Sequence, residues 1–455
     1  MTAADAGPEV AVGSLTTELA EILRREVPAA LLPRAARHVL DWIGCAVIGA
    51  TTEPGRIVAA TASRFGAGPC HAIGVGALDA TGAAFVNGAY GNALEMDDIH
   101  RTAILHPGPV VIPAALAAAE QHGAAPKAFL EAVVRGYEAA IRVGRSVGPG
   151  HYRLWHKTAS CGVFGSAAAV ASILGLDAER SVWALGNAGT QAAGPWQCRL
   201  EGAMSKQLHT ARAAEAGLVA AELAAAGFTG PHQILEGALG FYAAMCPDPS
   251  PAELTADADG PWLISETSFK PWPACRHAHA TIDAALLLRE RVSLADIRQI
   301  VVGTYADAIE FCDNPAPGST LEAKFSLQHC AAVVLRDGAP DLGSFEAAAY
   351  DDPALTAFRD RIVVEAAEPY RAAYPRHYGA GLTARLDDGH EVSVAVADAY
   401  GDPENPLPEA GLVAKAEMLM AAAGLPAPRI EAVVAAAIAL PDADSLSELT
   451  ELLPN

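Results

Sequence analysis

Residues 128–144, AFLEAVVRGYEAAIRVG, carry apolar side chains at three- and four-residue spacing. This period is typical of an amphipathic helix that buries one face. The same spacing recurs in segments on both sides, and each segment ends near glycine or proline. Those segments are LTTELAEILRREV (15–27), AARHVLDWIGCAVIGA (35–50), AAFVNGAYGNALEM (83–96), PAALAAAEQHG (113–123) and TARAAEAGLVAAELAAAG (210–227). From about Leu15 to Leu263 the sequence therefore predicts a compact all-helical body without strands.

The pattern changes after Pro271. Two β-branched segments and a pair of segments flanking the polar turn 387–390 predict strands, with helical segments between them. The strand segments are IRQIVVGTY (297–305), RIVVEAAE (361–368), LTARL (382–386) and EVSVAVA (391–397), and the helical ones ATIDAALLLRERV (280–292) and AKFSLQHCAAVVLRDG (323–338). After GDPENPLP the pattern is helical again. We therefore expect a mostly α protein, with a helical domain (1–267) completed by C-terminal helices (405–455) and an inserted, smaller α+β domain (268–404).

Composition excludes several classes of protein. The chain has 31 Lys and Arg against 53 Asp and Glu, a formal net charge of −22. That charge repels the phosphate backbone, so we expect no nucleic-acid partner. The eight cysteines are scattered without ligand spacing, which favours reduced thiols in the cytoplasm over a zinc site or disulfides. The N-terminus has no signal-peptide pattern, and the uncharged stretch Thr158–Leu176 is Ala- and Gly-rich, as in a buried helix rather than a membrane span.

The stretch LEMDDIHRTAILHPGPVVIPAALAAAE, residues 94–120, places Glu95, Asp97, Asp98 and His106 in front of an apolar segment. We expect a helix to begin near Pro113, with the acids and His106 in the loop before it. Taken alone, such a cluster is more often a set of helix caps than a site.

Three further loops repeat this design. GHYRLWHKTASCGVFG places His156 and Lys157 before a helix, and EGAMSKQLHTARAAEAG places Lys206 at the next helix start, where the helix dipole disfavours a cation. SFKPWPACRHAHATIDAALLL carries cations, histidines and a cysteine on a proline-stiffened loop. These are Lys270, Cys275, Arg276, His277 and His279.

Helix beginnings also present backbone N–H groups that bind carboxylates. Cations gathered there from four loops suit a small molecule with several carboxylates. The sequence has no P-loop, no G-x-S-x-G and no G-x-G-x-x-G in a βαβ context. Acid–base chemistry without a cofactor or metal is therefore the remaining class of enzyme, and a non-catalytic helical scaffold is the alternative.

At these residues the chain resembles the MmgE/PrpD family, which includes 2-methylcitrate dehydratase, cis-aconitate decarboxylase and iminodisuccinate epimerase. NGAYGNALEMDDIH is similar to the family's N-G-x-x-x-H-x-x-D-F-D-D-T-H, and HPGPVVIPAALAAAE to its H-P-G-x-x-x-x-P-A-A-L-A-x-A-E. GFTGPHQILEG, FKPWPACRHAHATIDA, AKFSLQHCAAVVL and GDPENPLPEAGLVAKAEML follow in family order. The resemblance implies a large helical domain, a smaller α+β lid, a homodimer, and a metal-free active site in the cleft.

The resemblance places the family's active-site pattern on Glu95, His106, His156, Lys206 and Lys270. Five positions depart from that pattern, and one of them is Lys157, which stands in place of the proline of the family's H-P-T. Glu95 replaces the usual aspartate, Asn92 replaces a histidine, Cys275 replaces the decarboxylase-type histidine, and His329 replaces a tyrosine. These departures weaken the prediction of decarboxylation more than they weaken the prediction of the fold.

The expected reaction makes or quenches carbanion character beside a carboxylate. Lys206, Lys270 and Arg276 would hold the carboxylates, and His106 or His156 would move the proton. Glu95 or Asp98 would orient a histidine. Asp98, Cys275, Arg276, His277 and His329 complete the expected substrate-binding set. We expect a lyase that dehydrates a 2-methylcitrate-like hydroxy acid, with epimerisation and decarboxylation as alternatives.

Overall fold

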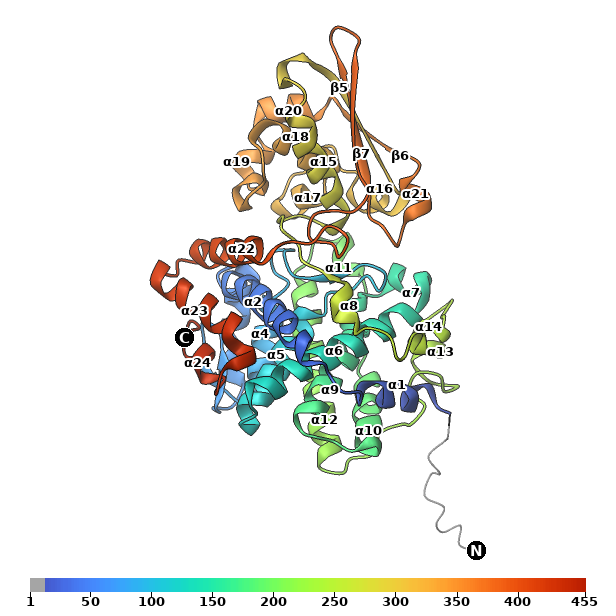
Figure 1. The fold of residues 1–455 in the computed structure, drawn as a ribbon, viewed down its shortest axis with the longest axis vertical. Coiled ribbons are helices and arrows are strands. Elements are labelled where there is room, and N and C mark those ends of the chain that lie inside the picture. Colours follow the sequence, from blue (N-terminus) through green and yellow to red (C-terminus); the bar gives the residue numbers. More distant parts are fainter. Residues whose placement is uncertain (1–12) are drawn as a thin grey trace, which may run out of the picture. The chain divides into compact units, whose positions relative to one another are not determined.

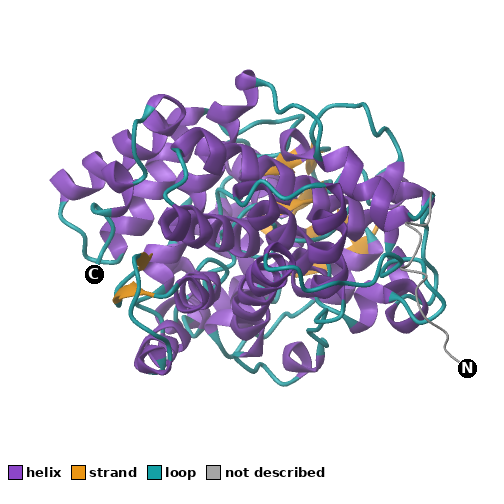
Figure 2. Ribbon diagram, turned by 90° about the horizontal axis from the view of Figure 1, so that it is seen from below, coloured by secondary structure: helices purple, strands orange, loops and turns teal. Residues whose placement is uncertain are grey.

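The computed structural model describes residues 13–455 and is mostly helical, with small sheets (Figures 1 and 2). Contacts between residues divide the chain into two compact units. We call them the helical unit, made of Met1–Ala93 as far as it is described, Asp97–Thr267 and Leu412–Asn455, and the α+β unit, made of Leu94–Met96 and Ser268–Gly411. The predicted domain boundaries at 267/268 and 404/405 stay predictions.

Most of the predicted helical segments form helices of the helical unit. The elements lying wholly within it are α1 (Leu15–Leu23), α2 (Leu32–Gly49), α3 (Glu53–Ala60), β1 (Cys70–Ala72), β2 (Gly76–Leu78), α4 (Ala80–Tyr90), β3 (Ile99–His100), α5 (Gly108–His122), α6 (Pro126–Ser146), α7 (Gly148–Leu154), α8 (Lys157–Ser160), α9 (Gly162–Ile173), α10 (Ala178–Gly189), α11 (Gln197–Leu200), α12 (Ser205–Ala225), α13 (Phe241–Met245), α14 (Ala252–Thr255), α23 (Ala427–Ala439) and α24 (Ser447–Thr450). β4 (Thr267–Ser268) and α22 (Glu409–Ala422) cross a unit boundary.

Small residues let these helices approach closely. A Cβ atom on Gly165 of α9 would lie 2.7 Å from the carbonyl oxygen of Gly136 of α6, closer than a normal contact. A Cβ on Gly217 of α12 would lie 1.9 Å from Ser166 Oγ of α9. The glycines are therefore required by backbone proximity, which explains the abundance of small residues along α6, α9 and α12.

The C-terminal helices belong to the same core as the first helices. Figure 1 shows α23 beside α2, and the two are in contact. Ala416, Met420 and Val433 are buried in the hydrophobic cluster that also contains Leu40. Lys415 Nζ lies 2.6 Å from Asp41 Oδ1, and both side chains are buried. Burial raises the pKa of Asp41 to about 6 although the Lys415 charge opposes this rise.

Replacing Lys415 with methionine is expected to lower the free energy of unfolding by roughly 3–5 kcal/mol, because Asp41 would stay buried without its cation. The Asp41→Asn/Lys415→Met double variant should lose less than the single variant. Urea unfolding of both proteins tests this expectation. Arg24→Ala, which removes the exposed Arg24–Glu21 pair, is the control and should cost less than about 1 kcal/mol. A single variant as stable as the control would contradict the prediction.

The α+β unit contains a four-stranded sheet in the order β6-β5-β7-β8. β5 pairs parallel with β6 and antiparallel with β7, which pairs antiparallel with β8 through the predicted turn at 387–390. α15 packs on β7 and β8, and α18 packs on β6. The elements are α15 (His279–Arg289), β5 (Ile297–Thr304), α16 (Ala306–Cys312), α17 (Thr320–Lys324), α18 (Leu327–Asp337), α19 (Ala347–Tyr350), α20 (Pro353–Arg359), β6 (Ile362–Ala366), α21 (Tyr370–Ala373), β7 (Ala380–Leu386) and β8 (Glu391–Val396).

Three local expectations for the helical body were wrong. The short β1–β2 hairpin was not expected, and its strands of three residues are too short to show an alternating pattern. The helix α4 ends at Tyr90 rather than Met96. α5 begins at Gly108, five residues before Pro113, because Asp98 Oδ1 accepts the Gly108 N–H at 3.0 Å and so caps the helix from outside.

The uncharged stretch 158–176 forms most of α8 and α9, and α9 is buried from Gly162 to Ala171, as expected for a core helix. Among the described residues, no helix combines the length and apolar character that a membrane span requires.

Candidate functional site

His106 lies in the loop before α5 and is held by its Nδ1 atom. His106 Nδ1 is 2.8 Å from the carbonyl oxygen of Asp98 and 3.0 Å from Asp97 Oδ2. A carbonyl oxygen only accepts hydrogen bonds, so Nδ1 carries the proton and Nε2 of the neutral ring carries a lone pair. Asn92 Nδ2 donates to the same Asp97 oxygen at 2.6 Å and fixes that carboxylate. His106 is therefore arranged as a base with an orienting acid.

Asp98 has a different role from its neighbour. Its Oδ2 accepts from Tyr137 Oη at 2.6 Å and lies 2.6 Å from His38 Nδ1, while Oδ1 accepts the Gly108 N–H. All of these groups are buried. Burial lowers the pKa of His38 to about 4, and burial together with the Asp98 charge raises that of Tyr137 well above its usual value. Both carboxylate oxygens of Asp98 thus tie the loop to α2, α5 and α6, and substrate binding by Asp98 stays a prediction.

His156 stands at the N-cap of α8, as the sequence predicted. It is 2% exposed, and its ring packs on Trp196 with 4.5 Å between the ring centroids. His156 Nδ1 lies 3.3 Å from Nδ1 of His209. Thr158 Oγ1 accepts the His106 N–H at 3.1 Å, which ties the His106 and His156 loops together.

Lys206 and His209 occupy the first two turns of α12. A spacing of three residues places them on one face of the helix. Burial, followed by the charges of Lys206, His209 and His106, lowers the pKa of His156 well below its usual value. Burial and the Lys206 charge also lower the pKa of His209. The helical unit therefore gathers three predicted residues, His106, His156 and Lys206, in one electrostatic neighbourhood.

A second group forms inside the α+β unit. Lys270 Nζ lies 3.8 Å from Glu95 Oε2, and both side chains are buried. Glu95 adopts a left-handed backbone with φ of 61°, which is costly for a residue with a side chain. Lys324 Nζ donates to the Leu94 carbonyl oxygen at 3.1 Å, and the Lys324 carbonyl accepts the Cys275 N–H at 2.9 Å. A buried lysine thus links the Glu95 turn to the Cys275 loop.

Cys275 is buried in this second group. Burial acts to raise the pKa of its thiol, but hydrogen bonds from the Cys312 thiol and the His277 backbone N–H, together with the Lys270 charge, outweigh burial and lower it. A thiol with a lowered pKa beside a lysine is a group able to exchange a proton.

The other predicted residues of this unit have protein partners. Arg276 forms a buried ion pair with Asp402, yet its Nε and Nη1 atoms have no hydrogen-bond partner among the described residues. His277 Nδ1 lies 2.8 Å from Tyr305 Oη. His329 Nε2 lies 2.8 Å from the Ser344 carbonyl oxygen, and its other ring nitrogen is 3.4 Å from Arg359 Nη1. Of the three, Arg276 retains donors for a carboxylate.

Sequence reasoning left several contributors out of the predicted site. The carboxylate that contacts His106 belongs to Asp97 and not to Glu95 or Asp98, which the sequence analysis had proposed. The sequence indicated Asp97 only through its place in the acidic cluster at residues 95–98. The spacing from Lys206 was a signal for His209. No sequence signal pointed to the remaining contributors, which are His38, Tyr137, Lys324 and Asp402.

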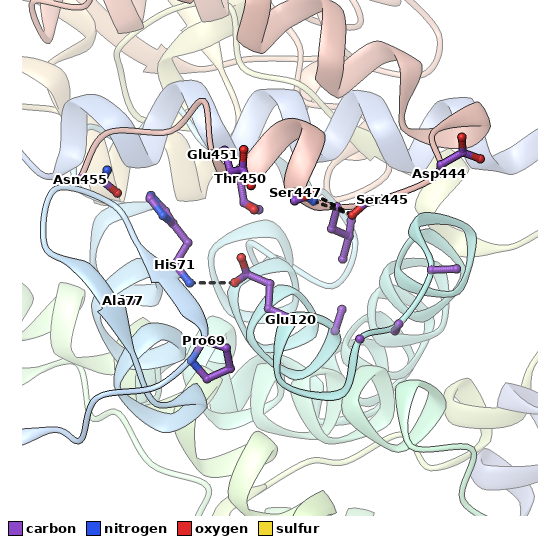
Figure 3. Close-up of a pocket in the computed structure, with 15 residues that line it drawn as sticks. Pro69, His71, Ala77, Glu120, Asp444, Ser445, Ser447, Thr450, Glu451 and Asn455 are labelled. Atoms are coloured by element: carbon purple, nitrogen blue, oxygen red, sulfur yellow. Dashed lines mark hydrogen bonds between the residues drawn. The ribbon is translucent and has the colours of Figure 1, made fainter.

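A cavity of about 590 Å³ lies elsewhere in the helical unit and is lined by β1, the end of α5 and the C-terminal segment (Figure 3). No predicted site residue lines it. The Glu120 carboxylate points into it, accepts the His71 N–H at 2.9 Å and hydrogen-bonds with Thr450.

Within residues 13–455, one group of side chains places potential metal ligand atoms within 4.8 Å of one another. Its members are His377, Asp398 and Glu404.

The contribution of Glu120 to stability is expected to fall as the pH rises from about 4.5 to about 7, because burial raises the pKa of Glu120 from 4.5 to about 7. A carboxyl with a raised pKa binds more protons in the folded state than in the unfolded state within this window, so deprotonation favours unfolding. Glu120→Gln should remove this loss, which is at most roughly 3 kcal/mol. The difference between the urea unfolding curves of the two proteins across pH isolates Glu120, since His71 titrates in both. Parallel curves would contradict the prediction.

Comparison with known proteins identifies the family. The MmgE/PrpD N-terminal domain matches residues 14–254, and the MmgE/PrpD C-terminal domain matches residues 272–437. The chain therefore belongs to the MmgE/PrpD family, as its motifs indicated.

Three similar proteins carry names that refer to cis-aconitate decarboxylase. The cis-aconitate decarboxylase-like protein oryM of Aspergillus oryzae is 29% identical over 438 residues, which cover 89% of each chain. The cis-aconitate decarboxylase of Aspergillus terreus is 30% identical over 339 residues, 69% of each chain. That of Homo sapiens is 29% identical over 356 residues, 74% of this chain and 72% of its own.

Proposed function

We propose that this protein is a lyase that works without a cofactor and moves a proton at the carbon next to a carboxylate of a small polycarboxylic acid. The observation that carries the proposal is the pairing of His106 Nδ1–H with the Asp98 carbonyl and the Asp97 carboxylate, which leaves Nε2 to act as the base. Family membership and the names of the relatives support the substrate class.

The leading reaction is dehydration of a hydroxy acid similar to 2-methylcitrate. His106 Nε2 takes the proton from the α-carbon, and the C–H electron pair becomes the carbon–carbon double bond. The β-carbon–oxygen bond breaks, and Nε2–H of His156 protonates the departing hydroxide to water. Acid–base help of this kind typically contributes about 10²–10⁴-fold to a rate. Asp97 favours this assignment because it stabilises the imidazolium that forms on His106.

In this proposal, cationic side chains bind the carboxylates of the substrate. Lys206 in the helical unit is proposed to bind a substrate carboxylate, and Lys270 and Arg276 in the α+β unit are proposed for the same function. Cations of this kind stabilise an enediolate-like intermediate. Two Arg276 nitrogens, Nε and Nη1, have no hydrogen-bond partner among residues 13–455, which supports carboxylate binding. Glu95 would orient Lys270, to which it is ion-paired.

Decarboxylation of an acid similar to cis-aconitate is the second candidate. The printed names of the relatives favour it. Here the carbon–carboxylate bond breaks, carbon dioxide leaves, and a protein group protonates the carbanion. Cys275, with its lowered thiol pKa beside Lys270, stands where the family's decarboxylase-type histidine falls and would have to supply that proton. The absence of an imidazole at this position is the reason for ranking dehydration first.

Proton NMR in deuterium oxide separates the reactions. The protein is incubated with 2-methylcitrate, citrate, cis-aconitate and iminodisuccinate in turn. Loss of water supports dehydration, loss of carbon dioxide supports decarboxylation, and deuterium incorporation with inversion supports epimerisation. If none of the four acids reacts or exchanges a proton, the substrate class is overturned.

Two variants distinguish an enzyme from a helical scaffold. His106→Ala and Lys206→Ala, each checked for an unchanged circular dichroism spectrum, should abolish the NMR signal of turnover. Unchanged turnover in both would mean that these residues only cap helices. The proposal also includes a cytoplasmic homodimer, for which light scattering after size exclusion gives the mass.

A further inference from the structure

His156 is cut off from solvent at the atom that would carry the reacting proton. Its Nε2 atom is buried and has no hydrogen-bond partner among residues 13–455. The Trp196 ring covers one side of the imidazole, and the backbone N–H of His156 is bound to the Gly194 carbonyl oxygen at 2.8 Å. The remaining ring nitrogen, Nδ1, meets Nδ1 of His209. His209, on the first turns of α12, is half-buried, so part of this residue is exposed to solvent.

Two neutral imidazoles that meet through their Nδ1 atoms must differ in tautomer. Burial lowers the pKa of both rings, and the Lys206 charge lowers both further, so neither ring is an imidazolium near neutral pH. His209 and then His106 act in the same direction on the pKa of His156, more weakly than burial and Lys206. One Nδ1 therefore donates the shared proton and the other accepts it. The position of that proton decides whether Nε2 of His156 is an acid or a base.

We propose that His209 is the positioning residue that sets the tautomer of His156 and renews the proton on its ring during turnover. When His209 Nδ1–H donates, His156 keeps its proton on Nε2 and is ready to act as an acid. When His156 gives that proton away, its ring needs a proton at Nδ1 to stay neutral. The hydrogen bond to His209 supplies this proton.

In the renewal, His156 gives its Nε2 proton to the leaving hydroxide and takes the shared proton of His209 on Nδ1, while His209 binds a solvent proton on Nε2. Both rings stay neutral, and each now holds the opposite tautomer. The α-proton taken by His106 then passes through the product water to His156 Nε2, the shared proton returns to His209 Nδ1, and His209 releases its Nε2 proton to solvent. One solvent proton enters and leaves at His209 in each cycle, and no oxidant or co-reactant is needed.

The surroundings of His209 fit this function. Gly194, with φ of 107°, packs on the ring, and a Cβ atom there would lie 3.4 Å from His209 Nδ1. The closest contact of that Cβ atom would be with Ala159 Cβ, at 3.0 Å. Burial, followed by the charge of Lys206 one turn earlier on the same face, lowers the pKa of both rings.

The tautomers are measured without any substrate. Protein labelled with ¹⁵N-histidine is examined by long-range ¹H–¹⁵N correlation, with His156→Gln and His209→Asn used to assign the two rings. We expect one ring protonated at Nδ1 and the other at Nε2 in the wild type. In His209→Asn the side-chain amide replaces the Nδ1–H donor, and His156 should stay protonated at Nε2. Identical tautomers in the two wild-type rings would overturn the proposal.

Turnover tests the renewal, which rests on the proposed function. His209→Ala is expected to lower kcat roughly 10–100-fold with little change in KM. Added imidazole should restore part of that loss with a pH profile that follows imidazole protonation, which a merely structural histidine would not produce. The exposed neighbour Leu208→Ala is the matched control. A kcat of His209→Ala within twofold of that control overturns the renewal.

The two experiments fail separately. If no polycarboxylate is turned over, the proposed function falls while the tautomer spectra still decide whether His209 sets the protonation of His156. If turnover is found but His209→Ala is fully active, the proposed function stands and the role of His209 is refuted.

Discussion

Replacing His106 with glutamine is expected to lower kcat about 10²–10⁴-fold and to change KM little. The ring is held by Asp97 and the Asp98 carbonyl through Nδ1, so its Nε2 atom is left to act as the proposed base. Glutamine keeps a polar group of similar length but takes no proton from carbon. Steady-state kinetics with the polycarboxylate found by NMR measure the effect.

The control for this prediction is Asp97→Asn. It keeps the volume and the acceptor for both Asn92 and His106 but removes the charge that stabilises an imidazolium. Its kcat should fall less than that of His106→Gln. A His106→Gln protein with kcat within threefold of the wild type would remove His106 from the role of base.

Replacing Asp98 with alanine is expected to lower the free energy of unfolding by roughly 3–5 kcal/mol. The substitution strips the hydrogen-bond partner from His38, from Tyr137 and from the Gly108 N–H, all of them buried. It also removes the cap that starts α5 at Gly108. Urea unfolding followed by far-ultraviolet circular dichroism measures the loss.

Tyr137→Phe is the matched control because it deletes one hydrogen bond to the same carboxylate and should cost about 1 kcal/mol. Activity is expected to fall in Asp98→Ala as well, since the Asp98 carbonyl and the loop position His106. An Asp98→Ala protein as stable as Tyr137→Phe would show that the carboxylate is not the anchor of the loop.

Adjacent acids thus have separate roles that the sequence could not assign. Asp97 and Asp98 are equivalent in any pattern of residue types, yet one faces His106 and the other faces His38. His38 lies 60 residues earlier on α2, and no local spacing connects it to the loop. Which of the two acids contacts His106 depends on which helices of the helical unit pack around residues 97–108.

Long periodic segments were the most reliable part of the sequence analysis. The segment 128–144 lies within α6, and the pair flanking 387–390 forms β7 and β8, because a buried face must repeat with the period of its own element. Short elements and helix ends were less predictable. α5 starts early because a distant carboxylate caps it, and β1 and β2 are too short to show a pattern.

The sequence by itself determined the mostly helical character, the strands after Pro271, the family and the residue types that suit acid–base chemistry on an anion. These properties follow from local periodicity and from motifs read in order along the chain. Only the tertiary structure decided which acid serves His106, that His156 meets His209, and that Lys324 holds the Glu95 turn. Each of these pairs joins residues whose distance in space is set by packing, and packing is a property of the whole folded chain.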